Sequence, residues 1–543
     1  MALLKQKEHI LVAIFSLCLL LIPVTGQCQY TYGVMTSKSD SLSHEIWTAY
    51  GGGYGAVNLV SANCVDPNSN VYVVGRIFIN MRFNDINLPM GLFVTKYDSQ
   101  GDLQWGRSLT GGTMVINGIA ADSDENCYVL GKFSKGIYAG TEELYSEHFW
   151  DVFMAKYDNT GEILWLKSVL QYEGRIEPCD ISINERYRHI YITGLQDSAL
   201  SMKYNFSRIF IAKFDMDNGE LIKKDSIGYY FGSPTAYDNA GYGITNDGSD
   251  LYISGSIKNT DRMADIYVAK LDTGLNIIWE KQFGDNYDGN WGYDITMDDD
   301  HCLYVTGGFS DTVNFDNQML AARDLSDLFV AKLTDAGDVL WAKSAGSNGG
   351  GYRGEDFGYS IAYDHKNSIY VSGYVGANAS FSEGLNTLYQ GPFLMKVSKS
   401  GDIRSAVSFY SMYDSNYERG VGFVSCDKNS NLYFSTHFID TLLSDRSTGM
   451  MMNRIDDNLK IYSDNNRGQL KISYEANESE TLYLMITDIY GRNVYRCIRK
   501  TVTGTNTFNL DLNDFQSGIY IISVGKNHTR WLSKKFYIWN KKP

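Results

Sequence analysis

Phe153-Met154-Ala155-Lys156-Tyr157-Asp158 is the stretch that decides the fold, because versions of it recur through most of the chain. Each version has an apolar pair, a small residue, a basic residue, an apolar residue and often Asp. The other strong copies are Phe93-Val94-Thr95-Lys96-Tyr97-Asp98, Phe210-Ile211-Ala212-Lys213-Phe214-Asp215, Tyr267-Val268-Ala269-Lys270-Leu271-Asp272 and Phe329-Val330-Ala331-Lys332-Leu333. Two weaker copies surround Lys396 and Arg454. The basic residues recur every 57 to 64 positions, which indicates a repeat protein.

A second motif alternates with the first and reads apolar, Tyr, apolar, any residue, Gly. Its seven copies centre on Tyr72, Tyr128, Tyr191, Tyr252, Tyr304, Tyr370 and Tyr433. Six copies end in Gly, and the seventh has Thr436 instead. Both motifs therefore predict seven repeats.

Each repeat contains four short segments with the pattern of β-strands. In one repeat they are residues 118–122, 128–131, 153–157 and 163–165, separated by polar turns. Such runs predict antiparallel sheets of four strands. A single sheet of this kind cannot cover both of its faces, so the sequence predicts seven sheets packed as the blades of an all-β propeller.

The two ends of the repeat region predict how the ring closes. No tryptophan strand follows the weak copy at Arg454, but Trp47 precedes the first repeat. We therefore expect Trp47 to supply the outer strand of the last blade, beside the strand that contains Arg454. Tryptophan recurs at this position and is expected to pack between blades. The seven residues at the position are Trp47, Trp105, Trp165, Lys223, Trp279, Trp341 and Ser405.

These elements together resemble the bacterial seven-bladed β-propeller repeat family, whose members carry SBBP-like repeats. The resemblance covers about residues 47–456. It implies the fold, but the family has no common catalytic residues to carry over.

The first 26 residues have the pattern of a secretory signal peptide. Lys5 and Lys7 give a basic start, residues 10–23 are nearly all apolar, and Val24-Thr25-Gly26 supplies small residues for cleavage. No similar run recurs, so no transmembrane segment is expected after cleavage.

The sequence from Leu459 onward no longer matches the repeat and predicts a small antiparallel β-sandwich. Three elements lie in order, Asp488-Ile489-Tyr490-Gly491-Arg492-Asn493-Val494, Gly518-Ile519-Tyr520 and Lys534-Lys535-Phe536. The tail resembles the C-terminal sorting domain of type IX secretion cargo, although Ser463-Asp464-Asn465 replaces a frequent Pro-Asn-Pro turn. The resemblance implies that type IX machinery carries the protein across the outer membrane of a gram-negative cell. The protein would then be attached to the surface or released.

We therefore expect three parts: a signal peptide at 1–26, the propeller at 27–458 and the sorting domain at 459–543. The net charge is −15, and it divides into +1, −22 and +6 over these parts. An acidic propeller repels phosphate backbones, so nucleic acid is not an expected partner.

No catalytic motif, cofactor motif or metal-ligand spacing is present in the sequence. The acidic turns after Asp66, Asp122 and Asp427 lack the Gly and Glu that an EF-hand needs at its sixth and twelfth positions. We interpret them as hairpin turns and expect no cofactor and no metal. Five cysteines lie in or beside strand patterns and are expected to be buried free thiols: Cys64, Cys127, Cys179, Cys302 and Cys426.

The loops before the first strand of each repeat are the candidate ligand-binding site, because such loops gather at one end of a propeller's channel. They combine aromatic rings with charged groups, as a glycan or peptide ligand requires. The candidate residues are Tyr237, Asp238, Tyr287, Asp288, Trp291, Tyr352, Arg353, Glu355, Tyr417 and Arg419.

The leading hypothesis is a surface binding or adhesion module for a glycan or peptide. One alternative is a glycan-degrading hydrolase or lyase that uses a carboxylate pair such as Asp288 and Glu355. The other is a structural surface component in which the Tyr-rich loops only pack over the channel mouth.

Overall fold

The computed structural model describes two compact units of the chain, one with strands β1 to β36 and one with β37 to β43. The residues described are 31–39, 45–54, 59–78, 80–83, 85–171, 174–201, 204–232, 239–258, 263–284, 289–347, 356–383, 385–386, 390–408, 422–440, 459–464, 469–476, 481–488, 493–511, 518–526 and 530–538. Within these ranges every regular element is a β-strand, which confirms the predicted all-β class.

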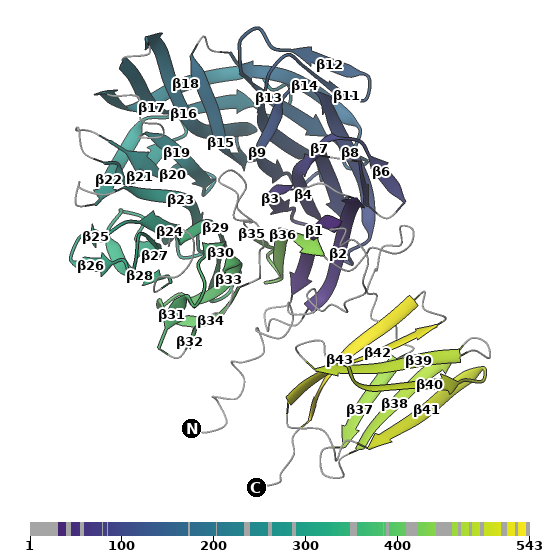
Figure 1. The fold of residues 1–543 in the computed structure, drawn as a ribbon. Helices are drawn as coiled ribbons and strands as arrows, with labels where there is room; N and C mark the ends of the chain where they lie inside the picture. Colours follow the sequence, from purple (N-terminus) through teal and green to yellow (C-terminus); the bar gives the residue numbers. More distant parts are fainter. Residues whose placement is uncertain are drawn as a thin grey trace. The chain divides into compact units, whose positions relative to one another are not determined.

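Seven antiparallel blades form the larger unit, as the two motifs predict (Figure 1). In the first six, the four strands run from the innermost to the outermost in chain order. They are β3 (Leu59–Val65), β4 (Val71–Ile77), β7 (Gly91–Tyr97) and β8 (Leu103–Gly111); β9 (Met114–Ala121), β10 (Cys127–Phe133), β13 (Asp151–Tyr157) and β14 (Ile163–Leu170); β15 (Arg175–Asn184), β16 (His189–Ser201), β17 (Tyr204–Asp215) and β18 (Leu221–Gly232); β19 (Ala240–Asn246), β20 (Asp250–Ile257), β21 (Asp265–Asp272) and β22 (Ile277–Phe283); β23 (Asn290–Met297), β24 (Leu303–Phe309), β27 (Asp327–Leu333) and β28 (Val339–Ala345); and β29 (Phe357–Tyr363), β30 (Ser368–Val375), β33 (Gly391–Ser398) and β34 (Ile403–Ser408).

The seventh blade joins the two ends of the propeller sequence. Its order is β35 (Gly422–Cys426), β36 (Leu432–Asp440), β1 (Thr31–Ser39) and β2 (Glu45–Tyr54). Trp47 lies on the outermost strand, as predicted, but its neighbour is β1 and not a strand around Arg454. That part of the prediction is wrong, and Arg454 lies outside the described residues.

Lys38 is the seventh basic residue of the repeat. It pairs with Tyr433, just as Lys96 pairs with Tyr72 in the first blade. Its Nζ donates a hydrogen bond to the Ser99 carbonyl at 3.0 Å, in the turn between the third and fourth strands of the first blade. Two N-terminal strands, and not one, therefore close the ring.

The residues that define the repeat hold neighbouring blades together. In the first blade, the Trp105 Nε1 and the Lys96 Nζ donate to the Asn159 carbonyl of the next blade at 3.1 and 3.4 Å. The Tyr72 hydroxyl donates to the Glu125 carbonyl of the next blade at 2.9 Å. Equivalent tryptophan bonds join Trp165 to Asp217, Trp279 to Asp335 and Trp341 to Lys399. Where Lys223 replaces tryptophan, its Nζ donates to the Gly274 carbonyl at 2.6 Å.

The Gly that ends the second motif is required by a close approach inside the blade. A Cβ on Gly75 would lie 1.9 Å from the Leu59 carbonyl oxygen, because the innermost strand has a bulge at this point. The seventh blade differs, since Thr436 pairs with Gly422 in a register without a bulge. In the seventh blade, therefore, the glycine of this pair lies on the innermost strand, at Gly422, and not at position 436.

Among the described residues, four short hairpins connect blades from outside. Each is inserted between the second and third strands of one blade and contacts the outermost strand of the preceding blade. They are β5 (Met81–Phe83) with β6 (Ile86–Leu88), β11 (Gly136–Ala139) with β12 (Glu142–Tyr145), β25 (Thr312–Phe315) with β26 (Gln318–Ala321), and β31 (Ser380–Ser382) with β32 (Leu385–Asn386).

The smaller unit contains two antiparallel sheets, of order β37-β38-β41 and β40-β39-β42-β43. The strands are β37 (Leu459–Asp464), β38 (Gln469–Ala476), β39 (Thr481–Asp488), β40 (Asn493–Lys500), β41 (Gly504–Asp511), β42 (Gly518–Lys526) and β43 (Arg530–Ile538). Their packing as a sandwich stays a prediction. No helix long and apolar enough to cross a membrane occurs in the parts of the chain that the structure describes.

Candidate ligand-binding face and central channel

One of the ten predicted ligand-binding residues lies within the described ranges. Trp291 is half-buried at the start of β23, and its ring meets the Phe357 ring of the next blade edge-on, with centroids 6.1 Å apart. The other nine lie outside the described residues: Tyr237, Asp238, Tyr287, Asp288, Tyr352, Arg353, Glu355, Tyr417 and Arg419. Their grouping into a site stays a prediction.

An aromatic row lies on three consecutive innermost strands, and the sequence reasoning missed it. The ring centroid of Tyr293 lies 5.1 Å from that of Tyr242 and 4.9 Å from that of Tyr359. All three rings are half-buried, and the strands that carry them surround the axis of the ring. The signal was available, because each tyrosine follows a glycine at the same repeat position.

Two carboxyl groups, one on β15 and one on β23, join neighbouring innermost strands. Asp180 accepts from the Ile244 amide at 2.9 Å, and Asp294 accepts from the Ile361 amide at 2.9 Å. Burial raises the pKa of Asp180 to about 7. Burial, and then the charge of Asp180, raise the pKa of Asp294. Both acids therefore keep their protons to a higher pH than an exposed carboxyl group does, and both help to hold the innermost strands together.

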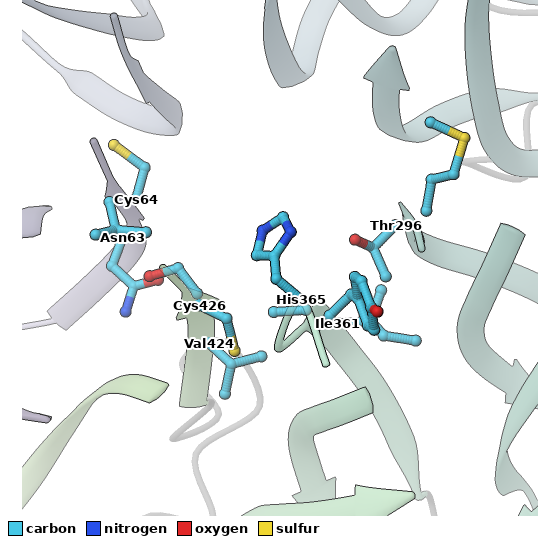
Figure 2. A pocket seen from close by; sticks show the side chains of 12 residues that line it. Asn63, Cys64, Thr296, Ile361, His365, Val424 and Cys426 are labelled. Atoms are coloured by element: carbon cyan, nitrogen blue, oxygen red, sulfur yellow. The ribbon is translucent and has the colours of Figure 1, made fainter. Parts of the chain in front are cut away.

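A cavity of about 270 Å³ opens where the innermost strands of four blades end (Figure 2). His365 projects between the side that carries Cys64 and the side that carries Thr296. Its Nδ1 lies 3.3 Å from Asp299 Oδ1. Burial raises the pKa of the Cys64 and Cys426 thiols, so the neutral form, a weak metal ligand, is favoured.

The described residues give no metal site. They contain no group of three or more His, Cys, Asp or Glu side chains placed to hold a metal ion. The five cysteines predicted to be buried and free are free, but the predicted burial is wrong for four of them, since Cys127 alone among the five is a buried residue.

The end of the propeller opposite the cavity exposes one apolar side chain from each of four blades. Because strands alternate in direction, the loops between second and third strands lie at the same end as the predicted ligand-binding loops. Each of the four residues stands one or two positions before a third strand. They are Met90, Phe149, Met263 and Leu325, with exposed fractions of 64, 85, 47 and 58%. The same repeat position thus places them at one face, which we call the loop face.

Comparison with known proteins identifies the tail. Residues 460–539 match the family described as the secretion system C-terminal sorting domain. An uncharacterized WD repeat-containing protein of Acanthamoeba polyphaga mimivirus is 30% identical over 123 residues, which are 19% of this chain and 9% of that protein.

Solved structures resemble the chain weakly. BamB from Moraxella catarrhalis has a TM-score of 0.30 and 11% identity over 73% of this chain and 88% of that one. A puromycin-hydrolyzing peptidase of Mycobacterium tuberculosis has a TM-score of 0.34 and 9% identity over 68% of this chain and 59% of that one.

The family match of residues 460–539 is the basis for assigning the secretion route. A sorting domain of this family directs export by type IX secretion, to the outer surface or the medium. The chain is therefore a seven-bladed β-propeller protein that ends in a type IX secretion C-terminal sorting domain.

Proposed function

We propose that the propeller is a surface binding or adhesion module, that its ligand is a glycan or a peptide, and that the ligand contacts the loop face. The observation that carries the proposal is the repeated exposure of an apolar side chain at one position of four blades. We also propose the division into a signal peptide at 1–26, the propeller at 27–458 and the sorting domain at 459–543.

Exposed apolar side chains also recur on the outermost strands, at Leu164, Ile222, Ile278 and Leu340, so the location of the loop face at one end of the propeller's channel supports it as the binding surface. Exposed apolar groups on a soluble protein are favourable to bury against a partner when they gather at one end. The polar residues that define the repeats are already used between blades, as the bonds of Trp105 and Lys96 show. These residues therefore have a structural role, and we assign the ligand contacts to the loops.

The test is binding of the full-length protein to glycan and peptide arrays. A variant with Phe149→Ser and Leu325→Ser should lose at least tenfold in affinity for any ligand found. The matched control is Leu164→Ser with Ile278→Ser, which removes equally apolar side chains that are each 53% exposed on outermost strands. Equal loss in both variants, or no ligand on either array, would reject the proposal. Turnover of an array glycan by the wild type would instead support the hydrolase alternative.

A further inference from the structure

The hairpin of β11 and β12 carries exposed aromatic rings that the fold does not require. Ile137 and Ala139 point inward and are buried, and Leu144 packs against the same core. Tyr138 and Tyr145 point outward, with exposed fractions of 40 and 58%. The alternation of a β-strand thus places the anchoring residues on one face of the hairpin and the rings on the other.

The two rings form an open corner. Their centroids are 6.3 Å apart, and their planes are at 90°. A Cβ on Gly136 would lie 3.0 Å from Tyr145 Cε1, so one side of the Tyr145 ring lies against the backbone of the opposite strand. The exposed fraction of Tyr145 shows that much of the ring still faces solvent. Such a fixed and exposed aromatic surface suits stacking by a flat apolar face.

Polar groups border this corner. The Tyr145 hydroxyl donates to Glu143 Oε2 at 3.0 Å, and the Tyr138 and Tyr145 hydroxyls lie 3.3 Å apart. Glu143 is exposed and lies opposite Tyr138, whereas Glu142 lies opposite Ala139 on the other face of the hairpin. Carboxylates accept hydrogen bonds from hydroxyl groups but repel anions. The corner therefore favours a ligand that is rich in hydroxyl groups and has no negative charge.

The other hairpins show that rings are not needed for the structural role. On β5 the outward residue is Arg82, paired with Asn87. On β25 it is Asn314, paired with Met319. Both hairpins bury apolar residues inward in the same way, and their outward side carries no aromatic ring.

We propose that the corner formed by Tyr138, Tyr145 and Glu143 on the β11–β12 hairpin is a binding site for neutral glycans. A pyranose ring stacks its C–H face on Tyr145 and rests its edge against Tyr138, and its hydroxyl groups donate to Glu143. Anionic polysaccharides are excluded by the Glu143 carboxylate and by the charge of −22 on residues 27–458. The inference rests on the proposed function and names the ligand class and one contact point.

The experiment is affinity electrophoresis of the full-length protein in gels that contain a soluble β-glucan, an α-mannan, a galactomannan or anionic polygalacturonate. At least one neutral polymer should retard the wild type more than polygalacturonate does. Tyr145→Ala should weaken that retardation at least tenfold, and Tyr138→Ala and Glu143→Gln severalfold. Met319→Ala, which removes a 72% exposed side chain from the β26 strand, is the matched control and should change nothing.

The outcomes separate this inference from the proposed function. If a neutral polymer binds but Tyr145→Ala and Glu143→Gln retain full affinity, the protein is a glycan binder and this site is wrong. If no neutral polymer retards the wild type, the site is also wrong, and the proposed function then depends on the peptide array. Retardation by a basic peptide polymer in place of the neutral glycans would likewise overturn the assignment. Unchanged melting temperatures in all variants show that each one is folded.

Discussion

Lys38 and Tyr433 come from opposite ends of the propeller sequence and lie directly opposite each other on β1 and β36. The Lys38 Nζ is 5.4 Å from the centre of the Tyr433 ring, which matches the 5.4 Å between Lys96 and the Tyr72 ring in the first blade. The last blade is therefore completed by the N-terminal segment with the same contacts that a continuous repeat would make.

Removal of residues 27–54 should destabilise the propeller strongly, because the last blade would keep only two strands and expose the edge of β36. We expect a melting temperature at least about 10 °C lower than that of the wild type, since several kcal/mol of packing are lost. Differential scanning calorimetry measures the change. Replacement of residues 312–321, the β25–β26 hairpin, by a short glycine linker is the control and should cost much less. Equal melting of the two deletions would contradict the closure described here.

The sequence predicted the blades but not all of their closure, for a physical reason. The strands of successive blades recur at a regular spacing, so one copy of a motif predicts where the next copy lies. β1 lies at the opposite end of the propeller sequence from its partner β36, and Lys38 has Ser37 before it where most strong copies have Ala. The aromatic row was readable from the glycine before each of Tyr242, Tyr293 and Tyr359. The Tyr138 and Tyr145 corner was not, because its geometry depends on the pairing of two short strands inside a loop.

Replacement of Trp105 tests whether the repeat tryptophans join blades. Trp105→Ala should lower the free energy of unfolding by about 3–5 kcal/mol, because the ring is only 3% exposed and would leave a cavity. Trp105→Phe should cost less, mainly through loss of the Nε1 bond to the Asn159 carbonyl, worth about 1 kcal/mol. Urea denaturation followed by circular dichroism measures both. If the two variants are equally stable, the ring does not pack as described.

The carboxyl groups of Asp180 and Asp294 should make stability depend on pH. Their pKa values are raised in the folded protein, so the native state keeps protons that the unfolded chain releases. Their contribution is neutral below the unfolded pKa near 4, and becomes increasingly destabilising as the pH rises toward about 7.

A variant with Asp180→Asn and Asp294→Asn keeps acceptors for the Ile244 and Ile361 amides but cannot ionise. Its melting temperature minus that of the wild type should be more positive at pH 8 than at pH 4. A pH-independent difference would refute the raised pKa values. Asp402→Asn is a suitable control, because its carboxyl group is exposed and its pKa is lowered.

Truncation after Asp457 should separate the two units functionally. Because the larger unit has its own core, the shortened chain should melt within about 2 °C of the propeller transition of the full-length protein. In a host with type IX secretion it should remain in the periplasm, since the matched segment at 460–539 is absent. Calorimetry and cell fractionation measure these outcomes. If the shortened chain is insoluble, the boundary between the propeller and the tail is not at Asp457. If the shortened chain is exported normally, the tail is not required for sorting.

Trp291 decides whether the predicted ligand-binding loops bind or only pack. As a ligand anchor, it should give a Trp291→Ala variant that loses about 1–3 kcal/mol of binding with little change in melting temperature. As a packing residue, it should give a variant that loses stability through its edge-on contact with Phe357, a contact worth about 0.5–1.5 kcal/mol beyond the buried area. A double-mutant cycle with Phe357→Ala isolates that contact. Trp291 is half-buried, so part of its ring can contact a ligand while part packs against Phe357. We expect Trp291→Ala to lose more binding free energy than the coupling energy between Trp291 and Phe357. Strong coupling to Phe357 with unchanged affinity for the array ligand would remove Trp291 from the binding site.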